Sequence, residues 1–597
     1  MKQFLFSALG AFVGVFLFVL LSLFMLGALI AAAVNAAGDN SAAEHSVAGD
    51  SLVLELDLRE PMLDQPSGAP FAFGETPSLT TTIEALARAE TDEKVKGVFI
   101  RANEFGMPPA QAEEIRDAIL GLRGAGKFVI THSQGFNSTS VLPYLAVSAS
   151  DELWLQDTAG FSATGLASET PFFGGALEKY NAQSQIFKIA EYKTAANSYN
   201  ESGYTDAHRE SLTAMLQSIY DSSLTQIAQD RDLTPQQARA ILDAAPYSTE
   251  AVVSTKLVDR MGQVSEARNA ALERAGGGDL VALTDYAEAR GSAWKKGPVI
   301  AMISGQGAVV TGETLDYTGP FGGGDYMGSD TIALAIDEAA KDESVKAIVY
   351  RVDSPGGSIV ASDQIWDAVE RAQEAGKPVV ISMGTLAASG GYYVSAGADH
   401  IVANPTTLTG SIGIFGGKIV VDGTLEMVGL NVEPLAVGGD FSGAYTAQRV
   451  FTESQEAAVR AYLQDGYDEF TTRVAEGREI PLPQVLEIAK GRVWTGQQAM
   501  ERGLVDELGG LRTAIDAAKR LAEIEPDASV TLKHFPRPLK GFEALQAFFG
   551  VSSEAAQAMI TLNNVAQLPE VQAALQARQA SERRGEIQAR SELPDVR

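Results

Sequence analysis

The sequence has no cysteine, and it has only 5 histidines among 597 residues. Without cysteine there are no disulfides, no thiol nucleophile and no cysteine-based metal site. Basic residues are also scarce: 46 Lys and Arg stand against 76 Asp and Glu, which gives a net charge of −30. Such a surface repels nucleic acid phosphates, so we expect no nucleic acid partner.

The composition is otherwise that of a folded protein. Hydrophobic residues make up 45% of the chain and charged residues 20%, which excludes global disorder. A chain of this length is too long for a single hydrophobic core and predicts several domains.

One long apolar run lies at the start of the chain. Residues 4–34 carry no charge, and about 20 apolar residues suffice to span a bilayer. Lys2 precedes the run and Asp39 is the first charge after it, so the positive-inside rule leaves the N-terminus in the cytoplasm. We therefore expect a membrane anchor over residues 1–38 with the bulk of the chain in a periplasm-like space. The alanines at 31–33 leave cleavage of the segment open as an alternative.

The rest of the chain reads as a duplication. Residues 92–101 and 342–351 are identical at five of ten positions, and each segment leads to an Ala-Gly-Lys sequence. In both copies short apolar runs alternate with helical patterns, which predicts βαβ units and a parallel sheet. We expect an α/β fold with two tandem domains over residues 46–295 and 297–540. A helical, partly disordered tail over 541–597 is expected to follow, and a mobile glycine-rich loop is expected over 305–328.

Ser389 is the candidate nucleophile. It follows a predicted buried strand and precedes Gly390 and Gly391 at the start of a helical pattern. A serine there can be presented on a sharp turn beside backbone N–H groups, although a plain helix N-cap is the alternative. The loop 353–358 adds Gly356 and Gly357 after another strand, and its N–H groups could hold an oxyanion.

The base for this serine is harder to find from the residues. None of the histidines (His45, His132, His208, His400 and His534) lies in a pattern that suggests a Ser-His-Asp triad. A lysine kept neutral by an apolar setting is the other option. Lys193 is the candidate, but a solvated lysine is the default interpretation of such a position.

Four motifs together resemble the signal peptide peptidase A family in its long, duplicated form. They are Ser-Pro-Gly-Gly-Ser at 354–358, Ala-Ser-Gly-Gly-Tyr-Tyr at 388–393, Thr-Gly-Ser-Ile-Gly at 409–413 and Tyr-Lys at 192–193. The family consists of membrane-anchored bacterial serine proteases, related in fold to the Clp protease and crotonase superfamily. The resemblance extends from the anchor to about residue 540.

The resemblance implies a role for each motif. Ser389 is then the nucleophile, Lys193 the general base and Ser411 the residue that orients the lysine. The backbone of Gly356, Gly357 and Gly390 would hold the oxyanion. It also implies signal peptide remnants as substrates, a homotetramer, and a place in the bacterial inner membrane with the catalytic domains on the periplasmic side. We expect neither a metal nor a cofactor.

The two copies have lost different parts of this site. The first copy has Thr139 near the position of the serine and no glycine loop, whereas the second has Gly443 where counting without gaps places Lys193. This predicts that neither half cleaves peptides alone. Two other functions stay open: an acyl-CoA enzyme of the crotonase type, and an inactive membrane-tethered scaffold.

Overall fold

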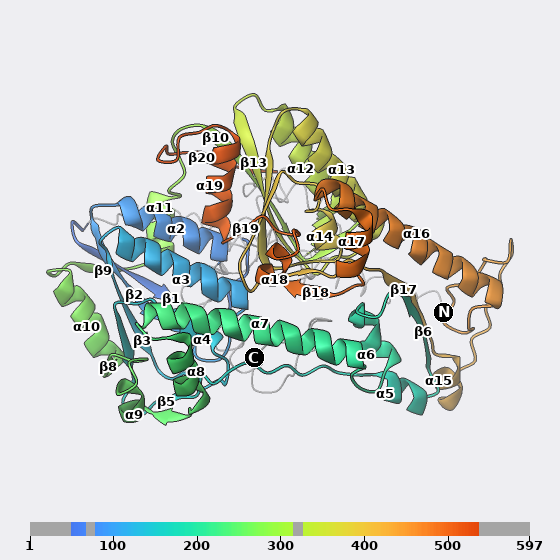
Figure 1. Cartoon of the computed structure of the whole chain (residues 1–597), viewed down its shortest axis with the longest axis horizontal. Helices are drawn as coiled ribbons and strands as arrows, with labels where there is room; N and C mark the ends of the chain where they lie inside the picture. Colours follow the sequence, from blue (N-terminus) through green and yellow to red (C-terminus); the bar gives the residue numbers. More distant parts are fainter. Residues whose placement is uncertain (1–48, 67–77, 315–325, 537–597) are drawn as a thin grey trace, which may run out of the picture.

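The computed structural model describes residues 49–66, 78–314 and 326–536 (Figure 1). The predicted anchor (1–38) and tail (541–597) lie outside the described residues, as do residues 315–325 of the glycine-rich loop. Within the described ranges no helix combines the length and the apolar content that a bilayer span requires.

The first repeat is built on a six-stranded parallel sheet. Its strands follow the order β8-β4-β3-β2-β1-β9, with bounds β1 Leu52–Asp57, β2 Val95–Arg101, β3 Phe128–Ser133, β4 Glu152–Leu155, β8 Arg260–Met261 and β9 Asp279–Ala282. One face packs on α2 (Leu79–Thr91), α3 (Pro109–Gly124) and α11 (Leu283–Arg290). The other face is covered by α10 (Val264–Arg274).

The second repeat has the same sheet order. Strands β20-β10-β13-β14-β15-β19 correspond to β9-β1-β2-β3-β4-β8, with bounds β10 Val299–Gln306, β13 Val345–Ser354, β14 Val379–Ala388, β15 His400–Ala403, β19 Glu507–Leu508 and β20 Thr531–Phe535. Helices α12 (Ser329–Lys341) and α13 (Ile359–Glu374) cover one face and α19 (Leu511–Leu521) the other. The predicted α/β fold with parallel sheets is confirmed, and the duplication is visible in the strand order.

Equivalent details recur in the two repeats. Lys127 Nζ donates to the carbonyls of Asp92 and Val95, and Lys377 Nζ donates to those of Asp342 and Val345. Each of these lysines therefore ties the start of the second strand of its repeat to the start of the third.

The second sheet differs where it extends toward the candidate site. Strand β14 has ten residues, whereas its counterpart β3 has six. The extra length pairs with β16 (Leu408–Gly410), which in turn pairs with the antiparallel β18 (Val493–Thr495). These additions carry the end of β14 away from the common core.

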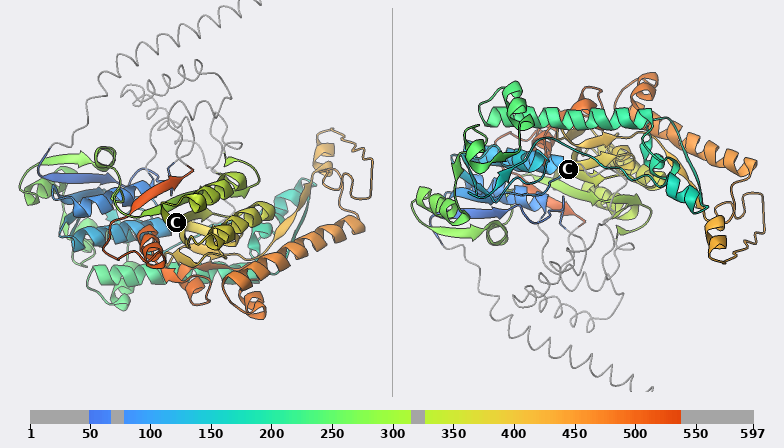
Figure 2. Two further views of the ribbon diagram at one scale, coloured as in Figure 1. Left: turned by 90° about the horizontal axis from the view of Figure 1, so that it is seen from above. Right: turned by 90° about the horizontal axis from the view of Figure 1, so that it is seen from below.

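A two-stranded ribbon joins the repeats at one end of the molecule (Figures 1 and 2). Strand β6 (Gln183–Lys188) of the first repeat pairs antiparallel with β17 (Phe415–Val420) of the second. Two 25-residue helices, α7 (Asp206–Asp230) and α16 (Glu453–Gly477), begin near this end.

The smaller elements are α4 Leu142–Leu145, β5 Gly160–Phe161, α5 Gly174–Lys179, η1 Thr194–Ala196, α6 Asn197–Asn200, α8 Pro235–Asp243, β7 Tyr247–Ser248, α9 Thr249–Val253, β11 Ala308–Val310, β12 Tyr326–Gly328, α14 Gly390–Tyr393, α15 Asp422–Met427, α17 Leu482–Ile488 and α18 Gly496–Met500.

A buried charge cluster also fixes the repeats relative to each other. Arg351 of β13 is 0% exposed, and its guanidinium donates to Asp64 Oδ2 at 2.9 Å and to Glu114 Oε1 at 2.8 Å. Burial opposes the charge of Arg351, but the two carboxylates outweigh it and raise its pKa. Next to Glu114, Glu113 accepts hydrogen bonds from the backbone N–H and the hydroxyl of Thr406. Separating a buried charge from its partner costs several kcal/mol, so these pairs define one arrangement of the two sheets.

Candidate active site

Ser389 lies on a strained turn between β14 and the short helix α14. Its φ is +56° and its ψ is −119°, a sparsely populated conformation that costs a non-glycine residue about 1–3 kcal/mol. Its N–H donates to Gly410 O of the neighbouring strand at 2.9 Å, and its carbonyl accepts from Tyr392 and Tyr393. Strain of this kind at a half-buried serine is typical of a nucleophile presented at the top of a sheet.

The glycine loop after β13 packs directly against this serine. Gly356 has φ +92°, and a methyl group added there would lie 2.8 Å from Ser389 Cβ. Likewise a methyl group on Gly390 would lie 3.0 Å from the Gly357 nitrogen. The three predicted glycines therefore meet around Ser389, and only residues without Cβ allow this approach.

Hydrogen bonds to neighbouring strands hold the loop in place. Ser354 Oγ donates to Gly307 O at 2.6 Å and accepts from the Gly356 N–H at 3.1 Å. Val309 of β11 accepts from Ser358 and donates to Gly356 O. These bonds fix the direction of the backbone N–H groups, which is what stabilisation of an oxyanion requires.

Lys193 reaches the site from the other repeat. It is 3% exposed, and its Nζ lies 2.9 Å from Ser389 Oγ, 2.9 Å from Ser411 O and 3.0 Å from Ser411 Oγ. The three candidate side chains are therefore brought together within one chain. The residues in contact are 196 positions apart in the sequence.

The ribbon explains how Lys193 comes to this place. The N–H of Ile189, just after β6, donates to Ile414 O just before β17. The segments that carry Lys193 and Ser411 therefore lie side by side at the same end of the ribbon. Gly491 lies against the lysine from the other side, where a methyl group would stand 2.6 Å from Lys193 Cβ. Gly413 similarly leaves room for the side chain, since a methyl group there would lie 3.3 Å from Lys193 Cδ.

Next to Lys193, Tyr192 of the first repeat and Arg492 of the second repeat both bind the carboxylate of Glu210. Tyr192 donates through its hydroxyl to Glu210 at 2.9 Å, and Arg492 donates to the same carboxylate at 2.8 Å. The guanidinium of Arg492 stands 4.9 Å from the centre of the Tyr192 ring. The hydrogen bonds from Tyr192 and Arg492 lower the pKa of Glu210. This exposed group adds a second link between the repeats near the lysine.

Asp353 supports the strand that leads to Ser389. Its Oδ1 accepts from the Leu386 N–H at 2.9 Å, three residues before Ser389. Loss of water around the carboxyl raises the pKa of Asp353, and the nearby Asp64 carboxylate raises it further. Asp353 links the inter-repeat charge cluster to β14, and neither its partner nor this role was evident in the sequence.

The first repeat does not reproduce the site. Tyr144 and Tyr392 make equivalent bonds from their hydroxyls to Leu257 O and Leu504 O, which aligns Ser389 with Val141 and not with Thr139. The copies differ in loop length here, since the first has two more residues between its Ala-Gly-Lys segment and this tyrosine. Val141 is buried and apolar, so the first repeat has no hydroxyl at the position that corresponds to Ser389.

Sequence comparisons agree with a duplicated peptidase. The model of peptidase family S49 matches residues 125–276 and 371–525, one segment in each repeat. Protease 4 of Salmonella typhi is 30% identical over 461 residues, which cover 75% of this chain and 72% of that protein. The chloroplastic serine protease SPPA of Arabidopsis thaliana is 28% identical over 495 residues, covering 81% and 71% of the two chains. A putative signal peptide peptidase SppA of Enterococcus faecium is 34% identical over 190 residues, which cover 32% of this chain and 55% of the relative.

Proposed function

Because the chain belongs to peptidase family S49 and is a serine peptidase, we propose that it cleaves peptides with a dyad of Ser389 and Lys193. The observation that carries this proposal is the 2.9 Å contact between Lys193 Nζ and Ser389 Oγ. This distance lies within the reach that direct proton transfer needs.

In the proposed mechanism Lys193 acts as the general base. Its 3% exposure favours a neutral amine, because burial disfavours the charged form. The amine takes the proton of Ser389 as Oγ attacks the peptide carbonyl, and it returns this proton to the leaving amine. Ser411 holds Nζ through its carbonyl and its hydroxyl during both steps.

The glycine loop stabilises the charge that develops during attack. The N–H groups of Gly357 and Gly390 lie beside Ser389 and are placed to donate to the oxyanion. The acyl group then rests on Ser389 Oγ, and water releases it with Lys193 again accepting a proton. No metal is needed for either half of this reaction.

We further propose apolar peptides such as signal peptide remnants as the substrates. The relative from Enterococcus faecium carries the name of a signal peptide peptidase. The apolar run at 4–34 supports a chain held at a bacterial inner membrane with its repeats on the periplasmic side. Such a peptidase would meet membrane-derived peptides at high local concentration. A Clp/crotonase-like fold for each repeat and an anchor over 1–38 belong to the same proposal.

Site-directed variants test the dyad. We expect the wild type to hydrolyse an apolar fluorogenic peptide, and Ser389→Ala and Lys193→Ala to lose turnover while keeping the thermal unfolding temperature within a few degrees. Lys179→Ala, which removes an exposed lysine of α5, is the matched control and should keep full kcat. Full kcat in Lys193→Ala across neutral pH would remove the lysine from the mechanism.

The same assay separates the two other functions. An acyl-CoA enzyme would turn over a thioester after Ser389→Ala, and an inactive scaffold would show no turnover even as wild type. The repeats can also be expressed separately and then mixed. Since each half of the dyad comes from a different repeat, either half alone should be inactive.

Assembly into a homotetramer is part of the proposal. Large apolar side chains are exposed along residues 427–445, and Leu435 and Val437 are almost fully exposed at 100% and 99%. An exposed apolar segment of this kind is typical of a protein interface. Leu435→Asp with Val437→Asp should lower the molar mass measured by light scattering, whereas Leu334→Asp on the solvent-exposed side of helix α12 should leave it unchanged.

A further inference from the structure

A basic pocket lies at the edge of the first sheet where its parallel strands begin. Its cavity of about 790 Å³ is lined at the start of β2 by Lys96, at the start of β3 by Phe128 and at the end of α10 by Arg274. The candidate active site lies in the second repeat, at the carboxyl end of strand β14, whereas this pocket lies at the amino ends of strands in the first repeat. The peptidase mechanism therefore does not use this pocket.

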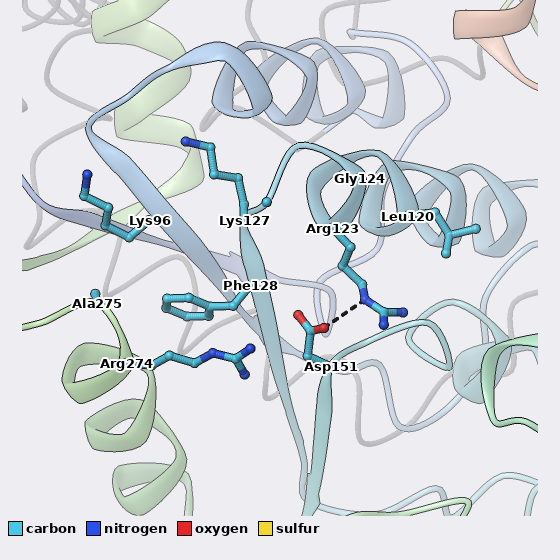
Figure 3. Close-up of a pocket in the computed structure, with 10 residues that line it drawn as sticks. Lys96, Leu120, Arg123, Gly124, Lys127, Phe128, Asp151, Arg274 and Ala275 are labelled. Atoms are coloured by element: carbon cyan, nitrogen blue, oxygen red, sulfur yellow. Dashed lines mark hydrogen bonds and ion pairs between the residues drawn. The ribbon is translucent and has the colours of Figure 1, made fainter.

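The pocket is basic on a strongly acidic protein. Four basic side chains and one acidic side chain line it, whereas the whole chain carries a net charge of −30. Figure 3 shows the guanidinium groups of Arg123 and Arg274 on either side of Asp151. Asp151 accepts from Arg123 Nε at 2.9 Å and from the Val129 N–H at 2.8 Å. Even when Glu152, which lies 3.6 Å from Arg274, is counted with Asp151, four basic side chains stand against two carboxylates, so the pocket keeps positive charge.

An aromatic ring forms part of the wall. The Arg274 guanidinium stands 5.1 Å from the centre of the Phe128 ring, and the nearest carboxylate to it, Glu152, is 3.6 Å away. Stacking on the ring holds the planar group in a fixed direction. A guanidinium held in this way can present a fork of donors to phosphate oxygens.

The second repeat shows that the fold does not require this charge. It keeps the two structural residues of the pocket, since Lys377 and Asp399 repeat the backbone bonds of Lys127 and Asp151. The other lining positions change: at the equivalents of Leu120, Arg123, Gly124, Phe128 and Arg274 the second repeat has Glu370, Gln373, Glu374, Pro378 and Leu521. Two basic residues then stand against three acidic ones. The arginines and the ring are features of the first repeat alone.

The described chain enters the first repeat beside this pocket. Ser51 Oγ donates at 3.0 Å to the carbonyl of Ala275, which lines the pocket, and Leu52 donates to Lys94 O. The expected anchor ends at residue 38, and the eleven residues from 39 to 49 can span at most about 40 Å. A chain anchored in this way keeps the pocket within reach of the bilayer surface.

We propose that this pocket binds the phosphate group of an anionic lipid headgroup at the membrane surface. Arg123 and Arg274 donate to the phosphate oxygens, and Lys96 adds positive charge at the rim. The interaction would orient an acidic protein on a surface that otherwise repels it. The inference rests on the proposed membrane anchor, and free phosphate is the other source of the same chemistry.

The test uses the full chain inserted in lipid nanodiscs. Amine acetylation followed by mass spectrometry gives the reaction rates of Lys96 and of Lys346, its equivalent in the second repeat. In discs with phosphatidylglycerol we expect the Lys96 rate to fall about fivefold relative to phosphatidylcholine discs, with Lys346 changed less than twofold. Arg123→Gln with Arg274→Leu, which installs the second-repeat residues, should weaken lipid binding about thirtyfold. The Lys96 rate of this variant in phosphatidylglycerol discs should then return to within about twofold of its rate in phosphatidylcholine discs. Lys341→Gln with Arg520→Gln removes two exposed charges of the second repeat, leaves the Lys346 reference in place and should keep the protection of Lys96.

Three results of this test would overturn the inference, each for a different reason. Protection of Lys96 that survives in the double arginine variant would come from the surface potential alone. Equal protection by inorganic phosphate in phosphatidylcholine discs would identify free phosphate as the ligand instead of a lipid. A chain that does not insert into the discs would refute the anchor, and the lipid with it. The double arginine variant should keep wild-type kcat on the peptide, so a failure of the pocket is distinct from a failure of the peptidase.

Discussion

Gly491 gives a direct test of how the second repeat receives Lys193. A Cβ added to this residue would lie 2.6 Å from Lys193 Cβ and 2.7 Å from its Cα. Carbon atoms that are not bonded approach to about 3.5 Å at their optimum. Gly491→Ala therefore forces the lysine backbone back by roughly 1 Å, and the 2.9 Å contact of Nζ with Ser389 Oγ lengthens beyond hydrogen-bond range.

The expected loss is about a hundredfold in kcat, because a misplacement of 1 Å in a catalytic group has about this effect. Gly376 provides the matched control, since its φ of +76° equals that of Gly491 and an added methyl group meets no atom within 4 Å. Both alanines bear the same left-handed backbone cost of about 1–2 kcal/mol. Only the substitution at Gly491 moves the lysine.

The assay is steady-state hydrolysis of an apolar fluorogenic peptide by the three proteins, with thermal unfolding measured in parallel. We expect Gly376→Ala to lose stability and keep kcat, and Gly491→Ala to lose both. Comparable kcat values in the two variants would show that the contact at Gly491 does not position Lys193.

Three further predictions follow from single contacts. Ser411→Ala should lower kcat only about tenfold, because Nζ keeps Ser411 O at 2.9 Å when the hydroxyl is lost; a loss as large as that of Lys193→Ala would contradict this. Burial raises the pKa of Glu113 to about 7, so its contribution to stability is complete below its unfolded pKa near 4.5 and is lost as pH rises through 7. That contribution is on the order of 3 kcal/mol, and Glu113→Gln should remove it. The unfolding temperature of the wild type relative to this variant should then fall from pH 5 to pH 8, and parallel curves would refute the assignment. Asp353→Asn keeps an acceptor for the Leu386 N–H and should stay within about threefold of wild-type kcat. Asp353→Ala leaves that N–H unpaired and should lower kcat about tenfold. Equal kcat values in the two variants would exclude a positioning role for Asp353.

The local pattern of the sequence predicts the sheets because each strand depends on its own residues. The apolar runs at 95–100 and 345–351 become β2 and β13, which are buried on both faces as expected for parallel strands. The duplicated segments become equivalent strands for the same reason. The turn at Ser389 was predictable in part, because two glycines follow a serine after a predicted buried strand, although a plain helix N-cap fitted the same residues.

Contacts between the repeats were not predictable from such local patterns. Lys193 has no local feature that separates it from other lysines, and its selection came from the resemblance. Gly491 precedes an ordinary strand, and only its contact with Lys193 explains why a residue without a Cβ is needed there. Counting without gaps also failed at Thr139, because two extra residues in a loop shift the alignment to Val141.

In the proposed mechanism, the division of the dyad between the repeats makes the activity depend on the interface between them. Ser389 is held by the second sheet and Lys193 by the ribbon, so their 2.9 Å contact exists only while both repeats keep one relative position. Buried Arg351 fixes that position through two carboxylates of the first repeat, and the same cluster touches the strand that leads to the nucleophile through Asp353. A duplication with two complete sites would work with a loose interface. If each copy supplies half of the site, as we propose, the activity requires a rigid interface, and we infer that the buried ions specify the single arrangement that two apolar surfaces alone would not.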